Sequence, residues 1–233
     1  LAPNKGDPPV TKRELLSTLM QLYDPLGWVL PAVVQMKLLL QDLLQSGSRD
    51  DWDERLSKEH LERAYWCAAL LKQARQFIIP RCYSSYEVGA IVNRQLHIFC
   101  DGSERAYGAC VYLRSQCNDG QVTCSLIIAK GRLCPKARTL TIPRVELCGA
   151  TVATHVAEIA RRELTHEIDD IQFWTDSTAV LGLINNTVRR FGVFVGNRVT
   201  KIRAMSDPRK WRYVPSADNP ADRISRGVAL VSD

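Results

Sequence analysis

The chain has 233 residues, of which 24% are charged and 45% hydrophobic, so it has the composition of a folded globular protein of one large or two modest domains. Its net charge of +6 permits a polyanionic partner without requiring one. No basic leader precedes an apolar segment, and the most apolar stretch is interrupted by Pro31, Lys37 and Asp42. The sequence therefore predicts an intracellular, cytoplasmic protein without a membrane partner. Its eight cysteines include no Cys-x-x-Cys pair, which argues against a zinc site.

The first third of the chain is predicted to be helical. The expected helices are one that follows a capping box at Thr11–Glu14, one over Pro31–Leu44 and one over Ser57–Gln76. No residue group in this part has the spacing of a catalytic site. We therefore expect residues 1–82 to form a small helical region that supports substrate binding, followed by a linker over residues 83–95.

From residue 96 onward the pattern changes to strands and helices of an α/β domain that spans residues 96–233. The expected strands are Leu96–Asp101, Tyr107–Arg114, Val122–Leu133, Ile171–Asp176 and Lys210–Pro215. The expected helices are Pro143–Leu164, Ser177–Asn185, Phe191–Met205 and a last one over Asn219–Arg226. This order predicts a mixed five-stranded sheet flanked by helices, in which the first three strands form an antiparallel meander.

Four acidic side chains are expected at one edge of that sheet. If the first and fourth strands are parallel neighbours, Asp101 and Asp176 end side by side, about 4.8 Å apart. The helix after the third strand starts at the same edge and carries Glu146 in its first turn. The start of the last helix brings both Asp218 and Asp222 there, and strand order alone does not choose between these two residues.

Carboxylates packed this closely repel one another unless a proton or a cation lies between them. Ligands that are all oxygen favour Mg²⁺ or Mn²⁺, and a site with room for two such ions suits phosphodiester hydrolysis. The spacing of the acids thus predicts a metal-dependent hydrolase.

Several motifs resemble known proteins. Four acidic motifs follow one another in the order that is typical of the ribonuclease H fold. They are Asp101-Gly-Ser103, Arg144-Val-Glu146-Leu147, Thr175-Asp176-Ser177 and Asn219-Pro-Ala-Asp222. The amino-acid sequences of Ile142–Cys148 and Asn219–Gly227 resemble those of the Pao/BEL family of LTR retrotransposons. In the same polyproteins, Thr11-Lys-Arg-Glu-Leu-Leu with Tyr23-Asp-Pro-Leu-Gly27 resembles the thumb and connection segment that follows the reverse-transcriptase palm.

The resemblance implies a ribonuclease H-type endonuclease that cuts the RNA strand of RNA–DNA hybrids with two Mg²⁺ ions, or Mn²⁺ in their place. It implies that Asp101 bridges both ions, that Glu146 and Asp176 complete the shell of one, and that Asp222 helps to hold the other. Asp218 is the rival for the fourth position, and the Asn-x-Ala-Asp context favours Asp222. The remainder of the polyprotein is an implied partner, and virus-like particles are an implied location.

The chain also departs from the pattern of this enzyme class. The loop Val214–Asn219 lacks the histidine that many ribonucleases H carry there, and Asn186–Arg190 leaves no room for a basic extra helix. No aromatic residue precedes Asp50-Asp51 or Asp169-Asp170, so we expect no polymerase activity.

Residues expected to contact nucleic acid are mostly basic and lie near the predicted site. They are Ser103, Arg138, Arg144, Ser177, Arg189, Arg190, Arg198 and Asn219. An alternative to the enzyme is a domesticated or degenerate module that keeps the fold and binds nucleic acid or protein without cutting.

Overall fold

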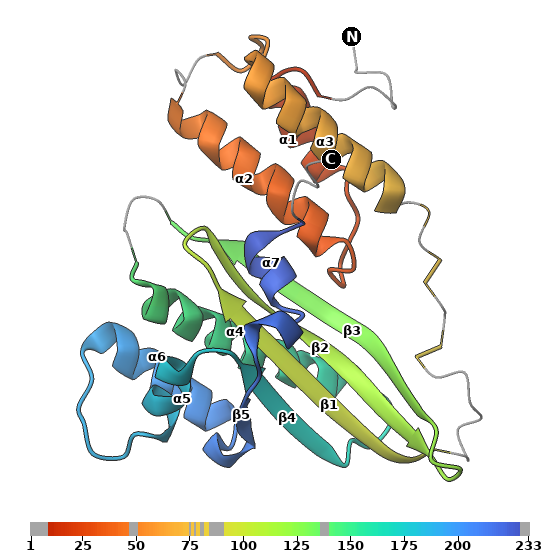
Figure 1. The fold of residues 1–233 in the computed structure, drawn as a ribbon, viewed down its shortest axis with the longest axis vertical. Helices are drawn as coiled ribbons and strands as arrows, with labels where there is room; N and C mark the ends of the chain where they lie inside the picture. Colours follow the sequence, from red (N-terminus) through yellow and green to blue (C-terminus); the bar gives the residue numbers. More distant parts are fainter. Residues whose placement is uncertain are drawn as a thin grey trace.

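A computed structural model of the chain describes residues 9–46, 51–74, 76, 78–79, 82–83, 91–135 and 140–228. In chain order its elements are α1 (Lys12–Met20), α2 (Leu30–Ser46), α3 (Lys58–Ala74), β1 (Ile91–Gly102), β2 (Ala106–Cys117), β3 (Val122–Leu133), α4 (Ile142–Glu163), β4 (Asp170–Thr175), α5 (Thr178–Asn185), α6 (Val193–Met205), β5 (Trp211–Tyr213) and α7 (Asp222–Arg226) (Figure 1). Short 3₁₀ turns at Pro208–Lys210 and Ser216–Asp218 flank β5. No helix among the described residues is long and apolar enough to cross a membrane.

The central element is a mixed five-stranded sheet with the strand order β3-β2-β1-β4-β5. Strands β1, β2 and β3 form an antiparallel meander, and β4 and β5 continue the sheet in parallel with β1. Helix α4 makes the crossover that returns the chain from β3 to β4. The predicted mixed sheet flanked by helices is therefore confirmed.

One strand is longer than its sequence pattern indicates. β1 begins at Ile91 rather than at Leu96. Ile91 and the exposed Val92 are followed by three polar residues, among them Arg94 opposite Ser115 of β2, so this segment lacks the apolar alternation by which strands are recognised. The linker predicted over residues 83–95 consequently overlaps this strand.

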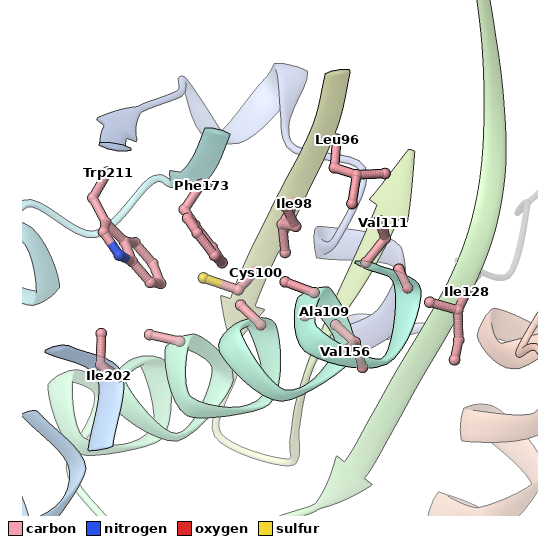
Figure 2. Packing of buried hydrophobic residues seen from close by; sticks show 14 of the residues in the cluster. Leu96, Ile98, Cys100, Ala109, Val111, Ile128, Val156, Phe173, Ile202 and Trp211 are labelled. Carbon is pink, nitrogen blue, oxygen red and sulfur yellow. The ribbon is translucent and has the colours of Figure 1, made fainter. Parts of the chain in front are cut away.

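The first face of the sheet packs against α4, α5 and α6 in the largest apolar cluster (Figure 2). Helix α4 presents small residues to the strands, which lets it lie very close to β1. A Cβ atom on Gly149 would stand 2.6 Å from the backbone oxygen of Asp101, and one on Gly102 would stand 2.7 Å from the backbone nitrogen of Glu146. Only glycine fits at either contact, so these two residues fix the distance between the start of α4 and the end of β1.

The second face is covered by α7 and by α2, which come from opposite ends of the chain (Figure 1). The buried residues of this layer are Leu30, Val34 and Leu38 of α2, Ala106 and Cys110 of β2, Ala129 of β3, and Ala221 with Ile224 at α7. The turn before α2 also docks on the sheet, because the Ala129 nitrogen donates to the Leu26 oxygen at 2.7 Å.

Helix α2 has a second apolar side that packs with α1 and α3. Met36 and Leu39 are fully buried there. The predicted capping box at the start of α1 is present, since the Glu14 nitrogen donates to the Thr11 hydroxyl at 3.2 Å and the Thr11 nitrogen donates to the Glu14 carboxylate at 3.2 Å. Helix α2 thus belongs to two cores at once.

Candidate active site

The ends of β1 and β4 bring the first two acids together. Cys100 and Thr175 are the last paired residues of these parallel strands, so Asp101 and Asp176 follow at the same edge of the sheet. The Asn219 side-chain amide donates to the Cys100 oxygen at 3.1 Å and so fastens the loop before α7 to this edge. The predicted juxtaposition of the two aspartates is observed.

Glu146 comes to the same edge from the other direction. Helix α4 begins at Ile142, so Glu146 is its fifth residue and lies just beyond the first turn in which the sequence pattern located it. The Ser177 hydroxyl, at the N-cap of α5, donates to the Glu146 carboxylate at 2.6 Å. This bond links the start of α4 to the residue that directly follows Asp176.

Asp222 and Asp218, the two candidates for the fourth acid, differ in their surroundings. Asp222 is the first residue of α7, and its negative charge raises the pKa of Asp101. Asp218 is exposed on the 3₁₀ turn that precedes it. The Asp222 carboxylate accepts a hydrogen bond from the Arg226 guanidinium at 2.5 Å, one helical turn further on.

Each of the other three acids accepts a hydrogen bond from a serine hydroxyl. Besides the Ser177 bond to Glu146, Ser225 of α7 donates to the Asp101 carboxylate, and Ser216 donates to the Asp176 carboxylate at 2.6 Å. The second oxygen of Asp176, Oδ1, is buried and has no hydrogen-bond partner. An acceptor of this kind is costly unless a donor or a cation reaches it.

Burial and mutual repulsion disfavour the ionised form of two of the acids. Desolvation is the main cause that raises the pKa of Asp101, and the charges of Asp176 and Asp222 raise it further. Desolvation also raises the pKa of Glu146, with smaller contributions from Asp176 and Asp101. Each shift is opposed by the serine that donates to the carboxylate. The four acids therefore form one electrostatically coupled group.

The donor set fits Mg²⁺ or Mn²⁺ in its chemistry, because every ligand atom is a carboxylate oxygen and the unpartnered Asp176 oxygen lies within the group. In the side-chain positions observed, no three His, Cys, Asp or Glu residues of the described part of the chain are arranged to hold an ion. The carboxylates point instead at the three serine hydroxyls and at Arg226.

The residues predicted to contact nucleic acid divide into two groups. Ser103, Ser177 and Asn219 make hydrogen bonds inside the protein; Ser103, for example, donates to the Ser225 oxygen at 2.8 Å. Three arginines are exposed, Arg144, Arg189 and Arg190, whereas the half-buried Arg198 donates inside the protein to the Phe194 oxygen at 3.0 Å. Arg144 and Arg198 both lie over the Phe194 ring, 5.4 Å and 3.5 Å from its centre. Arg138 lies outside the described residues.

Sequence reasoning missed the partners of the acids. Ser225 and Arg226 follow Asp222 at the three- and four-residue spacing that places side chains on one helix face, and this signal could have identified them. Ser216 offered no such signal, because its contact with Asp176 depends on how the loop after β5 folds back.

Together, a mixed sheet of this strand order, a crossover helix on one face and carboxylates at the carboxyl ends of β1 and β4 define the ribonuclease H-like class. Residues 11–177 match the family described as the Pao retrotransposon-like RNaseH-like domain, and the chain belongs to this family. No curated protein matches it.

Solved structures of similar proteins include the N-terminal RNase H domain of Rv2228c from Mycobacterium tuberculosis (14% identity, TM-score 0.38, 57% of this chain and 94% of that chain). A second is LC11-RNase H1, isolated from compost and solved with an RNA/DNA hybrid (9% identity, TM-score 0.37, 57% and 93%). A third is the foamy viral protease-reverse transcriptase with dsDNA (15% identity, TM-score 0.32, 91% and 40%).

Proposed function

We propose that the chain is a metal-dependent endonuclease that hydrolyses the RNA strand of RNA–DNA hybrids during retrotransposon reverse transcription. The observation that carries the proposal is the coupled group formed by Asp101, Glu146, Asp176 and Asp222 at one sheet edge. Membership of a ribonuclease H-like family supports the same reaction class. Its partners in this proposal are the hybrid and the remainder of the retrotransposon polyprotein.

Each acid has a separate role in the proposed site. Asp101 would contact both of two Mg²⁺ ions, Glu146 and Asp176 one of them, and Asp222 the other. Bound Mg²⁺, or Mn²⁺, supplies Lewis-acid chemistry for phosphodiester hydrolysis. The protein prepares the site by holding carboxylates that repel one another on rigid elements, and Ser177 orients Glu146 through their hydrogen bond.

The hybrid would lie across the arginines beside the acids. Arg144 is two residues before Glu146 at the start of α4, and it shares the Phe194 ring with Arg198, so the two cations form one basic patch near the start of α4. Arginines of this kind bind the phosphate backbone, while 2′-hydroxyl contacts distinguish the RNA strand. We expect hybrid to be cut in preference to duplex RNA and duplex DNA.

The alternative is a module that binds nucleic acid without cutting it. One observation favours it: a serine hydroxyl donates to each of three of the four acids, so the protein itself supplies partners for them. In a module that does not bind Mg²⁺, these hydrogen bonds would hold the carboxylates in place without an ion.

A cleavage assay separates the two functions. End-labelled hybrid is incubated with the wild type, with Asp101→Asn and with Asp222→Asn, in Mg²⁺ and in EDTA. We expect Mg²⁺-dependent cutting of the RNA strand that both substitutions abolish. Asp218→Asn is the matched control, because it removes an exposed carboxylate near Asp222 and should cut normally. A wild type that binds hybrid and never cuts it would establish the alternative.

A further inference from the structure

The shortest α-helix in the described part of the chain carries two residues of the candidate site. Helix α7 has five residues, among them Asp222 and Ser225. A single helical turn is not stable in isolation, so surrounding contacts must hold it. Its position therefore depends on the elements that enclose it.

One side of α7 lies directly on the sheet. Ile224 is buried against the glycines of two neighbouring strands. A Cβ atom would stand 2.4 Å from the Ile224 methyl group at Gly108 and 3.0 Å from it at Gly131. Because glycine has no side chain, these two positions leave the space in which Ile224 fits.

The other side of α7 is covered by α2, which supplies more than apolar surface. The Gln35 side-chain amide donates to the Arg226 oxygen at 2.8 Å and to the Val228 oxygen at 3.1 Å. The Arg226 carbonyl belongs to the last residue of α7, where backbone oxygens lack partners within the helix, and the Val228 carbonyl lies two residues beyond it. Gln35 therefore caps α7 from a helix far away in the sequence.

The residue between those carbonyls is adapted to this contact. Gly227 has a φ of +75°, which other residues rarely adopt, and a Cβ atom there would stand 2.3 Å from the Gln35 amide nitrogen. Glycine at position 227 thus both ends α7 and admits the Gln35 side chain.

Movement of α7 would change the position of Asp222 and the hydrogen bonding of Asp101. Asp222 begins this helix, and Ser225 donates to the Asp101 carboxylate while its own carbonyl accepts from Ser103. Loss of the cap would release the turn that holds Asp222 and would weaken the hydrogen bond that orients Asp101.

We propose that Gln35 is a positioning residue for the candidate active site, which it serves by fixing α7 and with it Asp222 and Ser225. The proposal rests on the proposed function for its effect on cleavage. Its structural part, the capping of α7, can be measured without any cleavage.

The test compares two glutamines of α2 in the full chain. Gln35→Met removes the donor and keeps side-chain length and helix propensity. Gln41→Met is the matched control, because the half-buried Gln41 amide also donates to a backbone oxygen, that of Cys134 after β3, at 3.0 Å. Hydrogen exchange is followed at the backbone amides of α7, and Mg²⁺-dependent hybrid cleavage is measured for both variants.

We expect Gln35→Met to speed exchange at α7 about tenfold, since two hydrogen bonds are lost, and Gln41→Met to leave it unchanged. We also expect Gln35→Met to lower kcat for hybrid cleavage with little change in KM, because Gln35 is not near the arginines that bind the hybrid. Unchanged exchange at α7 in Gln35→Met, or equal acceleration in both variants, would overturn the proposal. Faster hydrogen exchange at α7 together with an unaltered kcat would also overturn the positioning role.

The failure of the proposed function looks different. A wild type that never cuts hybrid refutes the nuclease, and the exchange data still decide whether Gln35 holds α7.

Discussion

The two faces of the sheet are built in different ways. The first face is covered by α4, α5 and α6, which lie between neighbouring strands in the sequence, and α4 alone contributes a 22-residue helix. The second face relies on the five residues of α7 and on α2, which starts at Leu30 and so lies at the other end of the chain. The candidate site lies where the faces meet, because Glu146 comes from the first layer and Asp222 from the second.

This difference indicates that the surrounding structure holds the two halves of the site with unequal rigidity. Glu146 stands on a long helix fixed to β1 by backbone contacts at Gly102 and Gly149. Asp222 stands on a single turn whose outer support comes from a helix that the sequence pattern assigns to a separate region. We infer that disturbance of the second face affects chemistry before it affects the rest of the fold.

Deletion of residues 1–82 is the largest disturbance of the second face. The sequence pattern predicts a folded remainder with weaker hybrid affinity, because the deleted helices carry no clustered acids. The contacts of α2 with Ala129, Ala221 and Ile224 lead us to expect more: exposed apolar surface, loss of order in α7 and no cleavage.

Circular dichroism, hydrogen exchange and the cleavage assay on the truncated protein decide between these expectations. A soluble, cooperatively folded and active remainder would show that α2 is dispensable and that the predicted domain boundary near residue 82 is correct.

A cavity in the apolar cluster on the first face should have the next largest effect, which is on the stability of the fold. Leu147 of α4 is fully buried in the larger cluster, so Leu147→Ala should lower the free energy of unfolding by about 2–5 kcal/mol. Urea unfolding measures this as a lower midpoint with an unchanged slope. Leu44→Ala in α2 is the control, because Leu44 is 50% exposed and its loss should change stability by less than about 0.5 kcal/mol.

A smaller cavity tests whether the faces differ in function. Ile224→Val in α7 and Ile184→Val in α5 each remove one methylene group from a buried site, and each should cost about 0.5–1.5 kcal/mol. If the second face controls the site, only Ile224→Val should also reduce the rise in melting temperature that Mg²⁺ produces. Equal Mg²⁺ responses in the two variants would contradict the comparison.

The sequence predicts the first face better than the second for a physical reason. Apolar runs that end in Asp101 and Asp176 and the small-residue stripe of α4 are local patterns, and they suffice to bring three acids to one edge. The Gln35 cap of α7 depends on tertiary packing between residues that are distant in the sequence, and no local pattern reports it. The start of β1 is not recognised from the sequence because three polar residues follow Val92 and interrupt the apolar alternation.

The smallest expected effect concerns the acids without metal. Burial and neighbouring charges raise the pKa of Asp101 and Glu146 in the folded protein, so between their unfolded and folded pKa values the native state binds more protons than the unfolded state. The stability contributed by these groups therefore falls as pH rises through that interval. In EDTA at neutral pH, Asp101→Asn should accordingly be at least as stable as the wild type, and its advantage should shrink as pH falls from the raised folded pKa of Asp101 to the ordinary carboxyl pKa.

Melting curves of both proteins at several pH values, with Asp218→Asn as a control for the change in net charge, measure this difference. Mg²⁺ should reverse it by stabilising the wild type and not Asp101→Asn, because the ion takes the place of the protons between the carboxylates. An Asp101→Asn protein that is less stable than the wild type at neutral pH in EDTA would assign Asp101 a structural role and remove the electrostatic argument for a metal site.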